Sequence, residues 1–193
     1  MSETKSIMIA GVGGQGTLLT SRILGNVLLS GGFDVKISEV HGMAQRGGSV
    51  VTFVRYGERV FSPVIDFGEA DYILSFELSE AARRLPFLKE NGIMIINEQK
   101  ISPMPVITGM AEYPTEITEK IRAAGANVKT IDALRLALDA GSSKAVNIVL
   151  LGMFSAIFGQ PIKLWELALE SEIKPELLDL NKKAFELGRK DGI

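Results

Sequence analysis

A turn near the start of the chain has the residue types and spacing that hold a phosphate or a carboxylate. Three glycines stand there at the spacing G-x-G-x-x-G, in the sequence GVGGQGT. Glycine lets a backbone turn tightly and approach a ligand closely. The free N–H groups of a helix that begins after such a turn favour an anion. The candidate cofactor-binding residues are Gly11, Gly13, Gly14, Gln15, Gly16 and Thr17.

A second polar stretch, residues 41–48, combines glycines with hydrogen-bonding side chains. Arg46 offers a planar guanidinium that suits a carboxylate or a phosphate, and Gln45 adds an amide. His41 is the only histidine of the chain, and a lone histidine is more often structural than catalytic. We interpret the stretch as functional, with contact to a partner chain as the favoured role and a salt bridge at the rim as the alternative. His41, Gln45 and Arg46 are the candidate catalytic residues.

No complete catalytic or metal-binding set accompanies these residues. The chain has no cysteine, which excludes disulfides, a cysteine nucleophile and cysteine ligands to zinc or iron–sulfur clusters. The serines lack a second histidine or a nucleophile elbow. Either a bound cofactor supplies the chemistry, therefore, or the chain is one subunit of a larger enzyme. Four acidic residues show no metal-ligand spacing: Asp66, Glu69, Asp71 and Glu77.

The elements that must position the two polar stretches are a strand, a helix and a second strand. Residues 6–10 are an apolar run that predicts a buried strand before the glycine turn. Apolar residues at helical spacing predict a helix after the turn, ended by Gly31-Gly32. Residues 33–40 alternate apolar and polar side chains, as an edge strand does, and lead into residues 41–48. Ligands of open α/β sheets bind at the carboxyl ends of the strands, where both stretches are expected.

The following segment departs from a simple β-α-β order. Residues 49–56 predict a strong strand, and residues 57–58 a tight turn into a short returning strand at 59–61. Further strands are expected at 71–76, 92–97 and 127–131, with a possible edge piece at 105–107, and helices at 77–85, 115–124, 133–140, 144–158, 162–169 and 175–189.

Together these patterns predict an α/β fold: a Rossmann-like arrangement of three layers, with a mostly parallel sheet, a β-hairpin insertion and a helical C-terminal third. There is no internal repeat, low-complexity tract or linker, so we expect a single domain over residues 1–193.

The composition of the chain restricts the classes of partner that it is expected to bind. Hydrophobic residues make up 46% of the chain and the net charge is −2, with no basic run, which argues against nucleic-acid binding. The polar start predicts no signal peptide, and the apolar run at 145–158 is too short to span a bilayer, so we expect a cytoplasmic protein without membrane contact. The glycine-rich loops and apolar helices favour a homodimer when the chain is isolated.

Three separated motifs resemble the gamma domain of 2-oxoacid:ferredoxin oxidoreductases. They are GVGGQG at 11–16, EVHGMAQRGGSV at 39–50 and KAVNIVLLG at 144–152. The resemblance covers nearly the whole chain, and its length and AQRGG loop are most similar to the small (beta) subunit of the indolepyruvate-oxidising members. A stand-alone gamma subunit of a pyruvate or 2-oxoglutarate enzyme is the next most similar. The last helix also fits the family's pattern, at Asn181, Ala184, Phe185 and Gly188.

This resemblance implies a subunit of a complex that oxidatively decarboxylates a 2-oxoacid, such as indolepyruvate or pyruvate, to an acyl-CoA. Electrons would pass to ferredoxin through the complex, and a larger partner subunit would hold thiamine diphosphate and the [4Fe–4S] clusters. The chain would hold none of these cofactors and be inactive alone, with coenzyme A as co-substrate. Residues 11–17 and 41–48 would face the shared cavity, where Arg46 or Gln45 binds a substrate carboxylate or a CoA phosphate and His41 orients the loop.

Two other interpretations remain open at this point. The first is a free-standing NAD(P)-dependent oxidoreductase, favoured by the glycine turn and by Glu39, which lies where a dinucleotide fold places its ribose-binding acid. The expected hairpin and the missing catalytic pair count against it. The second is a non-catalytic, Rossmann-like binding domain whose glycine turn only packs a helix against a strand.

Overall fold

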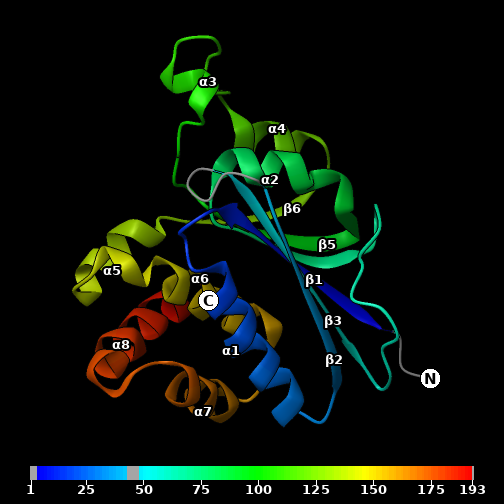
Figure 1. Ribbon diagram of the computed structural model, residues 1–193, viewed down its shortest axis with the longest axis vertical. Coiled ribbons are helices and arrows are strands. Elements are labelled where there is room, and N and C mark those ends of the chain that lie inside the picture. The colour runs from blue at the N-terminus through cyan, green and yellow to red at the C-terminus, as the bar shows by residue number, and fades with distance from the viewer. Residues whose placement is uncertain (1–3, 43–47, 193) are drawn as a thin grey trace.

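A single six-stranded sheet forms the centre of the molecule (Figure 1). The computed structural model describes residues 4–42 and 48–192, apart from the side chain of His41. In chain order the strands are β1 (Lys5–Val12), β2 (Asp34–His41), β3 (Ser49–Gly57), β4 (Ala70–Ser75), β5 (Leu88–Asn97) and β6 (Asn127–Ile131).

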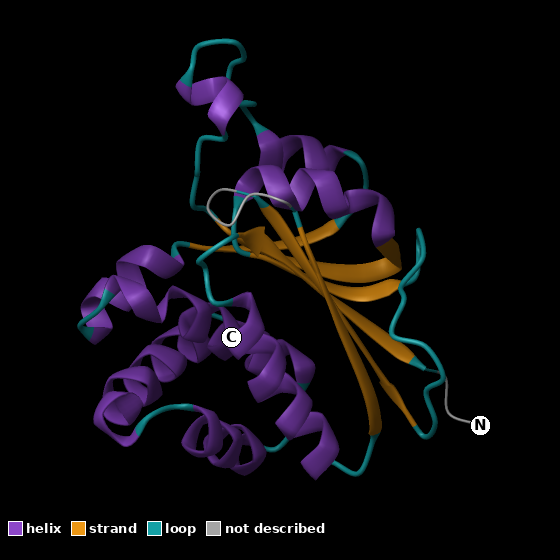
Figure 2. Ribbon diagram, viewed as in Figure 1, coloured by secondary structure: helices purple, strands orange, loops and turns teal. Residues whose placement is uncertain are grey.

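Helices cover both faces of this sheet, which gives three layers (Figure 2). The helices α1, α6, α7 and α8 cover one face, and α2 and α4 cover the other. The helices are α1 (Thr17–Ser30), α2 (Leu78–Arg84), α3 (Met104–Ile107), α4 (Ile117–Ala123), α5 (Ala133–Ala140), α6 (Val146–Phe158), α7 (Ile162–Glu172) and α8 (Pro175–Asp191), with 3₁₀ turns η1 (Leu85–Phe87) and η2 (Ser143–Ala145).

The strand order β2-β3-β1-β4-β5-β6 combines parallel and antiparallel pairs. Strands β1, β4, β5 and β6 run parallel to one another, whereas β3 lies antiparallel to both β1 and β2. The carboxyl ends of the four parallel strands therefore meet at one edge, together with the start of β3. The predicted α/β class, with a mostly parallel sheet and a helical C-terminal third, is confirmed.

The antiparallel insertion is built differently from the prediction. Strand β3 pairs with the whole length of β2, from Asp34↔Gly57 to His41↔Val50, and residues 59–61 form no strand. One cause is the carboxylate of Asp34, which accepts a hydrogen bond from the Val60 N–H at 2.8 Å. That N–H is therefore not available to pair with a neighbouring strand. The returning strand expected at 59–61 is therefore wrong.

The edge piece expected at residues 105–107 is also wrong. These residues belong to α3, a single turn of helix that projects from the body of the molecule (Figure 1). Pro105 stands at the start of this turn, where its missing N–H costs no helical hydrogen bond. Among the described residues, no strand pairs with this segment.

Helix α6 is the centre of the larger core cluster, because residues 146–155 are buried all round. It crosses α8 with the two backbones in contact. A Cβ atom at Gly188 would lie 1.9 Å from the carbonyl oxygen of Val149, and one at Gly152 would lie 2.1 Å from that of Phe185. Glycine is required at both positions because any side chain would separate the helices.

In the described part of the chain, no helix combines the length and the apolar character needed to cross a membrane.

We expect Gly188→Ala to lower the free energy of unfolding by about 2–4 kcal/mol, since the added methyl overlaps the Val149 carbonyl. In an uncrowded helix, replacing glycine by alanine stabilises the helix by about 1 kcal/mol. A loss of stability at position 188 therefore measures the steric effect of the close contact with α6. Urea unfolding followed by circular dichroism measures it. Glu186→Ala, at an exposed position of the same helix, is the control and should be near neutral. Equal stability of both variants would contradict the close crossing.

Candidate functional site

The glycine turn lies at the carboxyl edge of the sheet, between β1 and α1. Gly14 and Gly16 have positive φ angles of 97° and 80°, which side-chain-bearing residues rarely adopt. A Cβ atom at Gly16 would also lie 2.7 Å from the Nδ2 atom of Asn147, at the start of α6. Asn147 donates to the Gly16 carbonyl at 3.5 Å. The turn therefore packs directly against α6.

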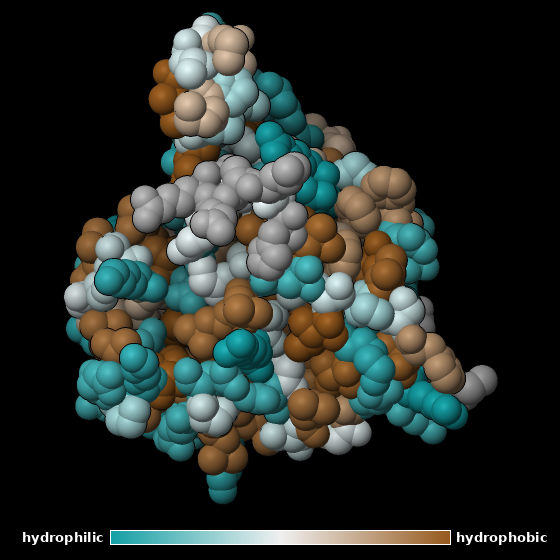
Figure 3. Space-filling view, in the orientation of Figure 1, coloured by the Kyte–Doolittle hydropathy of each residue, from teal (hydrophilic) through white to brown (hydrophobic). Residues whose placement is uncertain are grey.

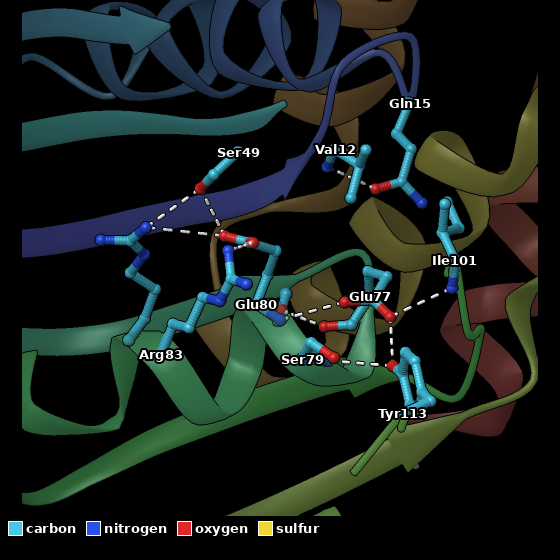
Figure 4. Close-up of polar contacts among 11 residues, drawn as sticks. Val12, Gln15, Ser49, Glu77, Ser79, Glu80, Arg83, Ile101 and Tyr113 are labelled. Atoms are coloured by element: carbon cyan, nitrogen blue, oxygen red, sulfur yellow. Dashed lines mark hydrogen bonds and ion pairs between the residues drawn. The ribbon is translucent and has the colours of Figure 1, made fainter. Parts of the chain in front are cut away.

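Gln15 holds the turn in shape through both ends of its amide, of which the contact with Val12 is drawn in Figure 4. Its Oε1 atom accepts a hydrogen bond from the Val12 N–H at 2.8 Å, within the turn. Its Nε2 atom donates to the Phe76 carbonyl at 3.0 Å and to Gln99 Oε1 at 3.4 Å. The side chain therefore connects the end of β1 to the segments that follow β4 and β5.

A second amide, Asn97, reaches the same carbonyl from the end of β5. Its Nδ2 atom donates to the Phe76 oxygen at 3.0 Å, and its Oδ1 atom accepts from the Ala133 N–H at 3.2 Å. Asn97 is fully buried, so these bonds replace water that the amide cannot reach. The sequence interpretation missed this network, since an asparagine at the end of a strand also suits an ordinary turn.

A cavity of about 710 Å³ opens beside the turn. Its walls come from the glycine turn, α1, η2, the start of α6 and the α7–α8 junction. The lining residues are Gly14, Gln15, Gly16, Leu19, Gln99, Leu134, Ser142, Ser143, Lys144, Ala145, Val146, Asn147, Glu172, Ile173, Lys174, Leu177, Leu180 and Asn181.

The electrostatic potential in this cavity favours the binding of an anion. The residues that precede α1, α6 and α8 all line it, namely Gly16, Ala145 and Lys174, and none of them caps its helix with a side chain. The positive ends of three helix dipoles therefore point toward it. Lys144 and Lys174 are exposed and form no ion pair with any residue that the structure describes. The carboxylate of Glu172 accepts from Asn26 at 2.9 Å.

Two buried carboxylates lie farther along the same edge, on the first turn of α2 (Figure 4). Glu77 caps the helix, since its Oε2 atom accepts from the Glu80 N–H at 3.0 Å. Its Oε1 atom accepts from the Ile101 N–H at 3.1 Å and from the hydroxyl of Tyr113. Glu77 therefore fixes the two ends of the segment that carries α3.

Glu80 connects α2 to the start of β3. Its Oε2 atom accepts from the Ser49 hydroxyl at 2.5 Å and lies 3.6 Å from Arg84, while its Oε1 atom pairs with Arg83 at 3.1 Å. Arg84 also donates to the Ser49 Oγ atom at 3.0 Å. The buried charge is therefore paired with two cations, as burial of a carboxylate requires.

The structure locates only part of the predicted site. All six candidate residues of the turn, which fall within positions 11–17, lie at the carboxyl edge, as the strand–turn–helix pattern predicts. His41 ends β2, whereas Gln45 and Arg46 lie outside the described residues. Gly48, the last residue of the 41–48 stretch, accepts a hydrogen bond from the Gly13 N–H at 3.0 Å, so that stretch ends beside the glycine turn.

Among the described residues, no group of three or more His, Cys, Asp or Glu side chains is arranged to hold a metal ion.

Burial, together with the hydrogen bond to Glu77, raises the pKa of Tyr113 to about 12. The unfolded phenol titrates near about 10, so folding stability from this group is complete below about pH 10 and is lost as the pH rises toward about 12. We expect wild-type protein to lose more stability between about pH 9 and about pH 12 than Tyr113→Phe does. Urea unfolding at several pH values measures this, and equal losses in both proteins would contradict the hydrogen bond between the half-buried Tyr113 and Glu77.

Comparisons with known proteins agree with this architecture. The chain is 40% identical over 190 residues to the indolepyruvate oxidoreductase subunit IorB of Thermococcus kodakarensis, which covers 96% of this chain and 94% of that protein. Its fold matches the gamma subunit of a keto/oxoacid ferredoxin oxidoreductase from Geobacter sulfurreducens, with a TM-score of 0.73, 22% identity, and coverage of 97% and 98% of the two chains.

A longer solved protein contains the same fold. The 2-oxoglutarate:ferredoxin oxidoreductase of Magnetococcus marinus matches with a TM-score of 0.76 and 18% identity, over all of this chain and 31% of that one. Residues 6–190 match the model of the family described as pyruvate ferredoxin/flavodoxin oxidoreductase. A match over nearly the whole sequence shows that the chain belongs to the pyruvate ferredoxin/flavodoxin oxidoreductase family.

Proposed function

We propose that this chain is the small subunit of an oxidoreductase that oxidatively decarboxylates indolepyruvate, makes an acyl-CoA and passes electrons to ferredoxin. Family membership confirms the prediction of a 2-oxoacid:ferredoxin oxidoreductase subunit. The observation that carries the choice of substrate is the 40% identity to a relative named for indolepyruvate, over 94% of that relative's length. Residues 1–193 act as a single unit in this proposal, in the cytoplasm.

We assign thiamine diphosphate and the [4Fe–4S] clusters to a larger partner subunit. The chain has no cysteine, so its own residues do not fit an iron–sulfur cluster held by thiolates. The 2-oxoacid and ferredoxin would meet the complex through that partner.

The cavity beside the glycine turn fits coenzyme A, the co-substrate. Lys144, Lys174 and the three helix dipoles suit its phosphates. The apolar part of the wall, which includes Leu134 and Leu177, suits its uncharged arm. When bound, coenzyme A supplies the thiol that accepts the acyl group; the residues of this chain bind and orient it.

The nicotinamide alternative is less well supported by the fold. Strand β3 lies between β1 and β2, so Glu39 is one strand farther from the glycine turn than the ribose-binding acid of a dinucleotide fold. Glu39 also accepts a hydrogen bond from the Thr52 hydroxyl at 2.9 Å. Saturable binding of NADH by the isolated chain would favour this alternative.

Affinity capture of the chain from cells that express it naturally tests the subunit assignment. We expect a larger protein to be eluted with it, carrying iron, acid-labile sulfide and thiamine diphosphate. The eluate should oxidise indolepyruvate faster than pyruvate or 2-oxoglutarate. A lone chain without these cofactors would contradict the proposal, and a preference for another 2-oxoacid would contradict the choice of substrate.

The double substitution Lys144→Ala and Lys174→Ala tests the cavity. We expect it to weaken binding of CoA to the purified complex by roughly tenfold or more, because two positive charges are removed from the wall. Isothermal titration calorimetry measures the Kd. Lys163→Ala, an exposed lysine of α7 outside the cavity, is the control and should bind as the wild type does. Unchanged affinity in the double variant would show that CoA does not bind in this cavity.

A further inference from the structure

The segment that carries α3 projects from the body of the molecule (Figure 1). We call residues 101–111 the finger. It leaves the body after β5 and returns to it before α4, at the same sheet edge as the glycine turn. The space-filling view shows hydrophobic side chains on this projecting tip (Figure 3).

The composition of the finger is unusual for a solvent-facing segment. Its sequence, ISPMPVITGMA, contains no charged residue, although Lys100 precedes it and Glu112 follows it. Three of its large apolar side chains are exposed: Met104 by 66%, Ile107 by 66% and Met110 by 77%. Single exposed apolar residues are common, but three on one uncharged projection mark a contact surface.

Hydrogen bonds within the finger hold its shape without packing against the core. The Pro105 carbonyl accepts from the N–H groups of Met110 and Ala111, at 2.8 and 3.0 Å. The Thr108 hydroxyl donates to the Met104 carbonyl at 3.0 Å. The two prolines, at 103 and 105, further restrict the backbone. A surface built in advance loses little conformational entropy when it binds.

The buried carboxylate of Glu77 fastens the base of the finger to the sheet edge. It accepts from the Ile101 N–H on one side and from the hydroxyl of Tyr113 on the other. The Lys100 ammonium lies 5.9 Å from the centre of the Tyr113 ring. The exposed tip is thus held in a fixed direction relative to the edge that carries the candidate site.

We propose that the finger inserts into an uncharged, apolar recess of the larger subunit. A recess that contains an unpaired charge would be disfavoured. The finger would remove water from that charge and offers no opposite charge to replace the lost hydration. This inference rests on the proposed function, since it takes its partner from the heteromeric complex.

A second copy of the chain does not suit the finger. Two fingers meeting tip to tip would bury only a few hundred Å² of apolar surface, well below the roughly 1,200 Å² of a stable interface, and would hold the two bodies apart. Two copies that each inserted a finger into the other's cavity would place this uncharged segment against charged walls, since Lys144, Lys174 and Glu172 line that cavity. A larger subunit can receive the finger and also contact the body around it.

The test is binding of the full chain to its larger subunit, measured with purified proteins by biolayer interferometry. The variant carries Ile107→Glu and Met110→Glu, both at exposed positions, so its fold and thermal unfolding should match the wild type. We expect its affinity to fall roughly tenfold or more, because a charge is forced into the recess. The control is Phe61→Glu, 80% exposed in the β3–β4 connection at the opposite sheet edge, which should bind as the wild type does.

Each other outcome overturns the inference in a distinguishable way. Wild-type affinity in the finger variant would remove the finger from the interface and leave the proposed function intact. Failure of the wild-type chain to bind the larger subunit would overturn the proposed function as well. If light scattering shows that the isolated chain self-associates and the finger variant does not, a second copy is the occupant instead.

Discussion

The shape of the candidate site depends on one backbone acceptor, the carbonyl of Phe76 just after β4. Gln15 and Asn97, from the ends of β1 and β5, both donate to it, and the N–H of Phe76 itself donates to the Ala10 carbonyl at 2.8 Å. The ends of three neighbouring strands are thereby tied together, and Asn97 extends the network to Ala133 at the start of α5. A buried amide that loses its hydrogen-bond partner is destabilised, because no water replaces the lost bond. The network therefore holds the glycine turn in one position.

Two further constraints place the surroundings of this edge. The close crossing at Gly152 and Gly188 fixes α6 and α8 relative to each other, and residues of both helices line the cavity. The two buried carboxylates at the start of α2 hold neighbouring segments at the same edge. Glu77 accepts a hydrogen bond from the base of the finger, and Glu80 accepts one from Ser49 at the start of β3. One edge therefore carries the anion-favouring cavity, the finger and the end of the 41–48 stretch.

The features predictable from the sequence were those that depend on local patterns. Helix α5 and strand β6 have the predicted bounds, and the glycine turn lies between a strand and a helix as predicted, because apolar periodicity, strand alternation and glycine spacing act over a few residues. The partner of β3 was not predictable in this way, because the choice between β2 and residues 59–61 rests on long-range pairing and on the bond from Val60 to Asp34. The cavity was missed for the same reason: Gly16, Lys144 and Lys174 are far apart in the sequence and meet only in the folded chain.

The most direct test of the central claim, that this chain is a working subunit of an indolepyruvate-oxidising complex, is reconstitution of the activity. The larger subunit is assayed for indolepyruvate- and CoA-dependent reduction of ferredoxin, with and without this chain. The account predicts that both proteins together reduce ferredoxin and that neither does so alone. Full activity of the larger subunit without this chain would contradict it.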